Sequence, residues 1–207
     1  MKSQIENVQS NTEKYITYRM LKGRQSAAIK GGFYFEAILI DYSLIEDRLY
    51  SYLYHMAIIE ERNSDKRFGK TKKVINSIVA EYKTEREKDT INLKNIGDKI
   101  KVIRSVIKWS INTTENYQYQ RYLSRLKSQC ESLDSQLILE TLDKIENWKN
   151  YRNEIIHSLM TKNVISLKES LVDRAIEGRK LAETLDNELR ILKRRNVIRN
   201  ACGLETN

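Results

Sequence analysis

The stretch FYFEAILIDYSLIEDRLYSYLYHMAIIEE, residues 33–61, decides the fold of this chain. Its apolar side chains recur every three or four residues, which places them on one broad stripe of an α-helix. They are Phe35, Ile38, Leu39, Tyr42, Ile45, Leu49, Leu53 and Met56. The pattern predicts a long buried helix over this stretch, entered at Gly31–Gly32 and followed by a polar loop over 62–69.

The same period predicts helices on both sides of this stretch. They are a more polar helix before Gly23, helices over 71–83 and 91–109, a helical region over 116–160 with a break near 130–134, and a last long helix over 165–195. Asp89 or Thr90 is expected to cap the helix that begins near 91, and turn-forming residues follow it over 110–116. The chain has no proline and only 7 glycines, so little interrupts these helices. We therefore predict an all-α fold, an up-and-down antiparallel bundle of about five to seven helices.

The length and composition predict a single helical domain over residues 1–207. Hydrophobic residues make up 40% of the 207, enough material for one good core. Within that domain the polar segment 1–30 is expected to be more peripheral, and residues 193–207 are expected to form a basic C-terminal tail.

Targeting signals and metal-binding patterns are not apparent in the sequence. No stretch approaches the roughly 18 apolar residues of a membrane span, and residues 1–7 lack the apolar run of a secretory signal. Cys130 and Cys202 form no C-x-x-C pair, and the chain has only 2 histidines. We expect a cytoplasmic protein that needs no membrane, no metal and no cofactor.

The formal charge of +9 favours a polyanionic partner, and RNA, DNA or an acidic protein all fit it. Positive charge is densest where the last helix ends. The residues are Arg190, Lys193, Arg194, Arg195 and Arg199. They complement the helix dipole and can also bind phosphates, and composition leaves both roles open.

The segment WKNYRNEIIHSL, residues 148–159, is where chemistry is most strongly indicated. It places Arg152, Asn153 and His157 in an apolar helical pattern. Histidine exchanges protons near neutral pH, arginine binds phosphate through its planar fork, and asparagine offers both donors and an acceptor. On a helix Asn153 and His157 share a face, whereas Arg152 lies about 140° around the axis from His157. Together they can cleave RNA without a metal, by attack of the 2′-hydroxyl on the adjacent phosphate.

Physics alone also permits a plainer interpretation of this segment. Arg152 would pair with Glu154 or Glu146 on the surface, and His157 would merely border the core.

Further residues can support a site of this kind. Glu46 and Asp47 can orient Arg152 or His157 across the bundle, or they can lie on an exposed face or pair with Arg48. Candidates for RNA binding are Lys149, Arg194 and Arg195.

Arg152, Asn153 and His157 resemble the signature of the HEPN superfamily, an arginine followed by a polar residue and, a few residues later, a histidine. The helical pattern resembles that family over about residues 33–192. The resemblance implies a bundle that dimerises, with Arg152 and His157 of two subunits forming one composite site. It also implies a metal-independent endoribonuclease, such as a toxin or an antiviral (phage-defence) effector, which can have an antitoxin or regulatory protein as partner.

One position departs from a subset of that family. HEPN toxins paired with nucleotidyltransferase antitoxins often have a tyrosine two residues after the histidine, where this chain has Leu159. The alternative function is a non-catalytic HEPN-like module that binds nucleotide, nucleic acid or a protein partner.

Overall fold

The computed structural model describes residues 11–60, 67–85, 91–114, 121–158, 164–195 and 197–202. Its helices are α1 (Asn11–Lys30), α2 (Tyr34–His55), α3 (Gly69–Tyr82), α4 (Ile96–Asn112), α5 (Arg121–Cys130), α6 (Ser135–Ser158), α7 (Val164–Arg195) and α8 (Val197–Cys202). Across these residues the only β-type pairing is an isolated bridge between Ile59 and Arg67. The predicted all-α helical bundle is confirmed, with seven helices of ten residues or more and the short α8.

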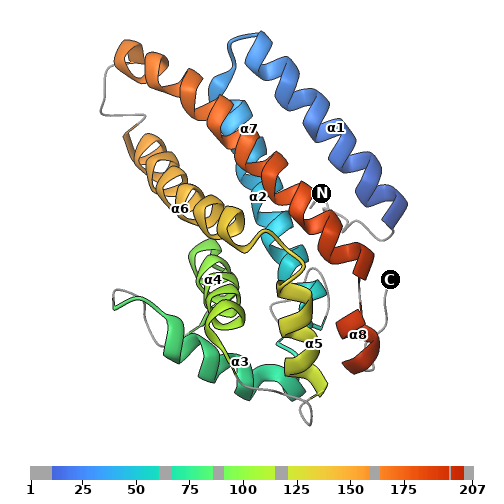
Figure 1. Ribbon diagram of the computed structural model, residues 1–207. Coiled ribbons are helices and arrows are strands. Elements are labelled where there is room, and N and C mark those ends of the chain that lie inside the picture. Colours follow the sequence, from blue (N-terminus) through green and yellow to red (C-terminus); the bar gives the residue numbers. More distant parts are fainter. Residues whose placement is uncertain are drawn as a thin grey trace, which may run out of the picture.

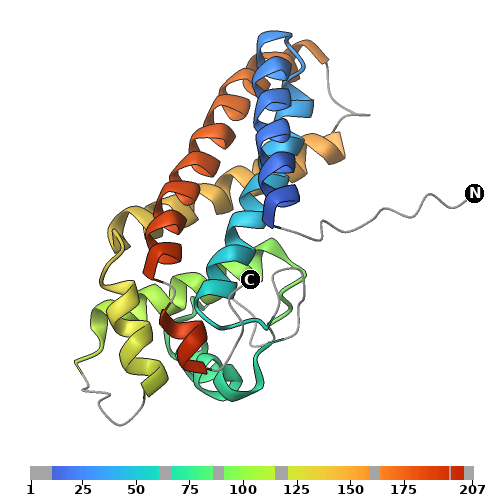
Figure 2. The ribbon, with the colours of Figure 1, turned by 90° about the vertical axis from the view of Figure 1, so that its right-hand side faces the viewer.

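Helix α2 lies at the centre of the bundle. It packs most extensively against α7 and also contacts α1 and α4, while α6 packs on α7 and α4. Figure 1 shows α1 at one edge of the molecule, with α2 and α7 between it and α6. Figure 2 shows α3, α4, α5 and α8 gathered at one end of the long helices, in the lower part of the view.

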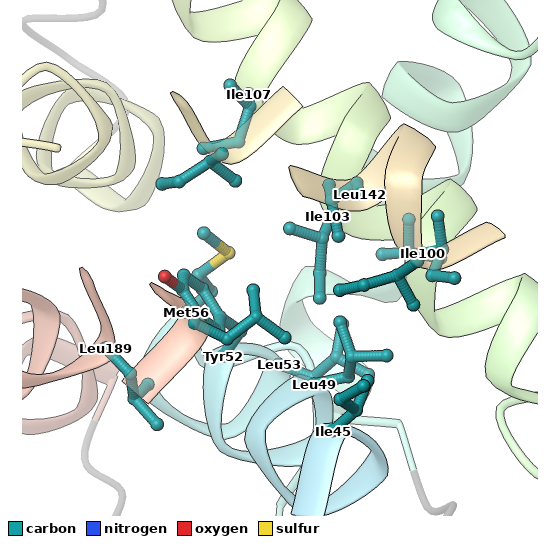
Figure 3. Close-up of a cluster of buried hydrophobic side chains, with 14 of the residues drawn as sticks. Ile45, Leu49, Tyr52, Leu53, Met56, Ile100, Ile103, Ile107, Leu142 and Leu189 are labelled. Atoms are coloured by element: carbon teal, nitrogen blue, oxygen red, sulfur yellow. The ribbon is translucent and has the colours of Figure 1, made fainter. Parts of the chain in front are cut away.

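The core forms where α2 meets α4, α6 and α7 (Figure 3). The labelled side chains are all at most 1% exposed: Ile45, Leu49, Tyr52, Leu53, Met56, Ile100, Ile103, Ile107, Leu142 and Leu189. Each buried aliphatic side chain of this size stabilises the fold by about 1.5–3 kcal/mol relative to an exposed one. The stripe predicted on residues 33–61 therefore supplies the centre of the core.

Helices α1 and α2 both end with a residue in the left-handed region of backbone conformation. Gly32 has φ 77°, and the N–H of Phe33 donates to the carbonyl of Ala28 at 2.8 Å. Ala57 has φ 55°, and the N–H of Ile58 donates to the carbonyl of Leu53 at 2.9 Å. These are Schellman-type ends. The prediction that α2 continues to about Glu61 was wrong, because the chain turns at Ala57.

Several other predicted boundaries shift. Helix α1 does not stop before Gly23 but continues to Lys30, and α4 begins at Ile96 rather than near 91. Its N-cap residue is Asn95, and the helix continues past Trp109 to Asn112. The predicted break near 130–134 is present between α5 and α6. The expected caps Asp89 and Thr90, and most of the predicted loop over 62–69, lie outside the described residues.

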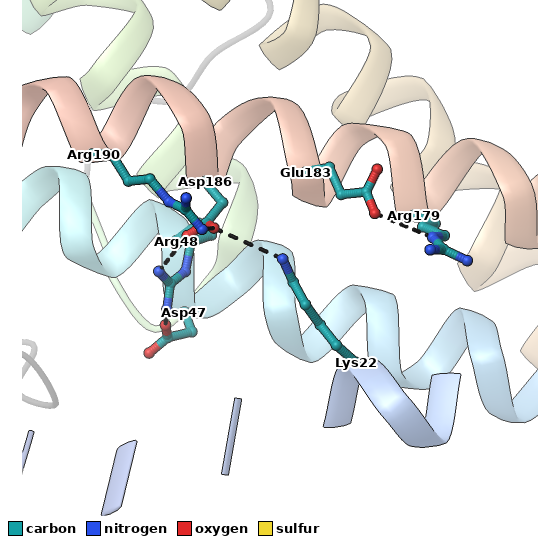
Figure 4. Close-up of polar contacts among 7 residues, drawn as sticks. All are labelled: Lys22, Asp47, Arg48, Arg179, Glu183, Asp186 and Arg190. Carbon is teal, nitrogen blue, oxygen red and sulfur yellow. Dashed lines mark hydrogen bonds and ion pairs between the residues drawn. The ribbon is translucent and has the colours of Figure 1, made fainter. Parts of the chain in front are cut away.

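A polar cluster joins α1, α2 and α7 on the side away from α6 (Figure 4). The buried Arg48 guanidinium donates to Asp186 at 2.8 Å and also pairs with Asp47. Arg190 contacts the same Asp186 carboxylate at 3.0 Å, and Lys22 reaches it at 3.8 Å. Removing one partner of a buried ion pair is costly, so this cluster fixes how the three helices meet.

At the opposite end, Arg199 fastens α8 to the end of α2. Its guanidinium donates to the carbonyls of Tyr54, Ile59 and Glu60 at 2.8–3.1 Å and lies 3.5 Å from the Tyr54 ring centre. Only 2% of Arg199 is exposed. It therefore serves as a structural residue rather than a surface cation.

Candidate functional site

Helix α6 carries the three residues of the predicted site. The Asp134 carboxylate accepts the backbone N–H of Leu137 at 3.0 Å and so caps the start of the helix. Ile145, Trp148 and Ile155 form its buried face, and the Trp148 indole donates to the Arg174 carbonyl of α7 at 2.8 Å. This anchoring fixes the rotation of α6, and with it the direction of the polar residues between the apolar ones.

Arg152 is directed toward α2. Its guanidinium carbon lies 4.2 Å from the centre of the Tyr42 ring, and Nη1 donates to the side-chain oxygen of Asn153 at 2.9 Å. Its Nε is buried and makes no hydrogen bond with the described residues. Burial raises the pKa of the Tyr42 hydroxyl, nearby Glu46 raises it further, and Arg152 opposes the shift. Of the five N–H donors of this guanidinium, one is held by Asn153.

His157 lies one turn beyond Asn153, in the last turn of α6, and its side chain is exposed. The two share a helix face, since they are four residues apart. The Arg152 side chain does not follow this face and extends to Tyr42 and Asn153. The surface pair between Arg152 and Glu146 is not formed, because the Glu146 carboxylate accepts from Arg104 at 2.5 Å.

A groove of about 610 Å³ opens beside Asn153, between α2, α6 and the start of α4. Its lining is Tyr42, Asn92, Lys94, Asn95, Ile96, Gly97, Asp98, Lys101, Glu146, Lys149 and Asn153. The first backbone N–H groups of α4 have no intrahelical acceptors, and the N-cap residue Asn95 makes no side-chain capping bond. The partial positive charge of a helix start therefore faces this groove.

Three lysines and two carboxylates border the groove. Asp98 is engaged by Lys101 at 3.0 Å, and Glu146 by Arg104 from outside the lining. The Lys149 amine lies over the first turn of α4, 3.4 Å from where a side chain on Gly97 would begin. With both carboxylates already paired, the lysines Lys94 and Lys149 give the groove an excess of positive charge suited to phosphate.

Glu46 and Asp47 are adjacent in sequence but serve different neighbours. The Glu46 carboxylate pairs with the fully buried Lys99 amine at 2.6 Å. Asp47 faces α1, where Lys14 reaches it at 2.5 Å, and also pairs with Arg48. Burial raises the pKa of Asp47, but Arg48 and Lys14 outweigh that and the net shift is downward. Asp47 is thus directed toward α1, and Glu46 is engaged by Lys99.

The C-terminal arginines lie far from the groove. Helix α7 starts near the end of α6 and runs 32 residues to Arg195, so its last turn is roughly 45 Å from its first. Arg194 is exposed in that last turn. The Arg195 side chain lies outside the described part of the structure. Of the two predicted RNA-binding residues whose side chains are described, Lys149 lines the groove with Asn153 and Arg194 does not.

Sequence reasoning missed Tyr42, Lys94 and Lys101 as site residues. Tyr42 belongs to the apolar stripe of α2, and Lys101 falls between the apolar positions Ile100 and Ile103 of α4, where a polar residue is ordinary. These residues therefore had no signal in the sequence. Only the structure shows that Lys101 is buried, which is uncommon for a lysine.

Comparisons with known proteins give no relatives for this chain: no family model, no curated protein and no solved structure matches it. None of the helices within the described ranges is long and apolar enough to cross a bilayer. Within the same ranges, no group of three or more histidine, cysteine, aspartate or glutamate side chains could hold a metal ion.

Proposed function

We propose that this protein is a metal-independent endoribonuclease of HEPN type, acting as a toxin or an antiviral-defence effector. The observation that carries the proposal is the arrangement around α6. Asn153 lines a basic groove, Arg152 contacts two residues of its lining, Tyr42 and Asn153, and His157 stands one turn further along the same helix. A strand bound by its phosphates in the groove would contact Asn153, and we propose that it extends along α6 toward Arg152 and His157.

The reaction requires two proton transfers and one charge stabilisation. The 2′-hydroxyl loses its proton and attacks the adjacent phosphorus, the bond to the 5′-oxygen breaks, and that oxygen takes up a proton. The products are a 2′,3′-cyclic phosphate and a 5′-hydroxyl end. His157 handles protons, and the Nη N–H groups of Arg152 that Asn153 leaves open stabilise charge on the phosphate oxygens. Asn153 holds the guanidinium in place through its side-chain oxygen.

The groove supplies binding rather than chemistry. Lys149 and Lys94 neutralise phosphates of the flanking strand, and the start of α4 contributes backbone N–H groups. The resemblance to HEPN proteins adds that two subunits would face each other, so that each site receives Arg152 and His157 from both. A homodimer would then be the active species, and an antitoxin or regulatory protein would act by covering the groove.

The test is incubation of the purified protein with mixed-sequence RNA in EDTA. We expect cleavage that is lost in Arg152→Ala and His157→Ala and retained in Lys144→Ala, a matched control that removes an exposed charge of α6 outside the groove lining. Circular dichroism must show that all variants are folded. Cleavage that survives both site substitutions would overturn the proposal.

A second candidate is a non-catalytic module that binds nucleotide or nucleic acid. It is favoured by the contacts of Arg152. The guanidinium packs on the Tyr42 ring and donates to Asn153, as a residue with a structural role does. This candidate predicts salt-sensitive binding of a short RNA without turnover. Lys149→Glu would weaken that binding, whereas loss of binding through Arg194→Glu alone would move the contact to the end of α7.

A further inference from the structure

The outer face of α1 carries an apolar stripe that no other part of the described chain covers. Ile16, Met20, Gly23 and Ala27 are spaced by four, three and four residues, so they share one face of the helix. Ile16 is 51% exposed and Met20 69%. The opposite face contains the buried Gln25 and packs on α2. Figure 1 shows α1 at one edge of the molecule, and in Figure 2, where that edge faces the viewer, α1 lies in front of α2.

Within the described residues of one copy, no contact requires glycine at position 23. It lies in the middle of a 20-residue helix, where glycine costs about 1 kcal/mol relative to alanine. A side chain added there would meet nothing within 4 Å among the described residues, and the backbone has an ordinary helical φ. A glycine at this cost on an exposed apolar stripe is explained if another helix approaches closely.

We propose that the stripe binds the same stripe of a second copy, with the two α1 helices antiparallel. In this register Ile16 of one copy lies opposite Ala27 of the other, and Met20 lies opposite Gly23. Each large side chain thus meets a small one, and the twofold axis repeats every contact. At the ends of the stripe Glu13, which also interacts within its own chain, lies opposite Lys30 of the other copy, so opposite charges face each other twice.

The parallel arrangement is disfavoured by the same residues. It would place Met20 opposite Met20 and Gly23 opposite Gly23, which leaves one layer overfilled and the next empty. It would also place Glu13 opposite Glu13 and Lys30 opposite Lys30. Like charges directly opposite one another are destabilising. Shape and charge therefore select the antiparallel register.

The basic flanks of α1 do not prevent this association, because most of them are neutralised within the chain. Lys14 pairs with Asp47, Lys22 approaches Asp186 at 3.8 Å, and Arg24 pairs with Glu36 at 2.5 Å. A partner of strongly acidic character would need exposed cations on the stripe itself. The stripe is apolar between Glu13 and Lys30, so a second copy fits it better.

This association leaves the groove open. Helix α2 meets α1 through Asp41 and Asp47, and it faces Arg152 through Tyr42. The proposed contact is thus distinct from the composite RNase site implied by the family resemblance. A single 20-residue helix spans about 30 Å, so two of them form an interface at or below the low end of specific interfaces, about 1,200 Å². The dimer is therefore weak and concentration-dependent.

The test is sedimentation velocity of the full chain over a range of concentrations. We expect a reversible monomer–dimer equilibrium, and we expect Lys30→Glu to weaken it by about tenfold, or about 1.4 kcal/mol, since it opposes two pairs of acidic side chains. Adding Glu13→Lys to that variant should restore the dimer. Lys72→Glu makes the same charge change at an exposed position of α3 and should have no effect.

Gly23→Leu separates association from stability. Leucine is the better helix former, so the variant should unfold at higher denaturant than wild type while its dimer dissociates. A wild-type chain that stays monomeric at every concentration would overturn the proposal. So would a dimer insensitive to Gly23→Leu and Lys30→Glu, and failure of the double charge exchange to restore association would overturn the antiparallel register.

Discussion

Replacing Gly178 by alanine tests how closely α7 crosses α6 behind the candidate site. A Cβ at this position would lie 2.6 Å from Cζ2 and 2.9 Å from Cε2 of Trp148, and 3.0 Å from Oδ2 of Asp41. Carbon atoms in contact normally stand about 3.5–4.0 Å apart. The methyl group therefore requires α7 or the indole ring to move by about 1 Å, which the surrounding packing opposes.

The magnitude follows from two opposing contributions. Helix propensity favours alanine over glycine by about 1 kcal/mol, whereas overpacking costs about 1–3 kcal/mol and more where neighbours cannot move. Trp148 is 1% exposed with its indole N–H bound to Arg174, and Asp41 is fully buried, so neither yields easily. We expect a net loss of about 2 kcal/mol, which lowers Tm by roughly 4–8 °C for a chain of this length.

The assay is urea unfolding followed by circular dichroism, at a protein concentration low enough to keep the chain monomeric. Gly23→Ala is the matched control, because an added methyl there meets nothing within 4 Å of the described structure, and it should stabilise by about 1 kcal/mol. Combining Gly178→Ala with Trp148→Phe should cost less than the sum of the two changes, since phenylalanine vacates the contested space. A Gly178→Ala protein as stable as wild type, or strict additivity with Trp148→Phe, would refute the close crossing.

Three other perturbations address single polar residues. Burial raises the pKa of Asp41 from 3.8 to about 7. The folded protein therefore keeps the Asp41 proton at pH values where the unfolded chain has lost it. As a result this carboxyl lowers the free energy of unfolding as pH rises from about 4 to 7. Asp41→Asn should therefore gain stability relative to wild type across that window in denaturation at several pH values; a difference independent of pH would contradict this. Arg199→Ala should lower the free energy of unfolding in urea by about 3 kcal/mol, and Arg199→Lys should recover only part of this, because three carbonyls accept from one guanidinium. A loss below about 1 kcal/mol would exclude the structural role of Arg199. Glu46→Gln removes the counter-ion of the buried Lys99 and should lower the free energy of unfolding by about 2 kcal/mol, whereas RNA cleavage per folded molecule should stay unchanged. A loss of cleavage without a loss of stability would show that Glu46 belongs to the site.

Much of the helical architecture could be predicted from the sequence. The apolar period on residues 33–61 located α2, and its buried side chains are those at the centre of the core. The boundaries were less predictable where a turn has no glycine or proline. Ala57 adopts the left-handed conformation that glycine usually signals, so the end of α2 was placed several residues too late.

The site was predictable only in part. The segment around Arg152 and Asn153 stands out by residue type, and the structure places Lys149, one turn before, in the same groove as Asn153. Tyr42 could not be assigned to that groove in advance, because a tyrosine on an apolar stripe is equally suited to the core. Arg194 was predicted to bind RNA together with Lys149 because both are positively charged, and charge alone does not show how close two residues lie in the fold.

The sequence by itself determined the helical class, the faces that are buried and the excess of positive charge, because these depend on neighbours within one or two turns of the same helix. Only the tertiary structure decided that Tyr42, Lys101 and Asn153 border one groove, that Asp47 faces α1, and that Gly178 lies against Trp148. These contacts join residues tens of positions apart. Their partners are set by how helices rotate and cross once all apolar faces compete for one core, and local periodicity does not encode that outcome.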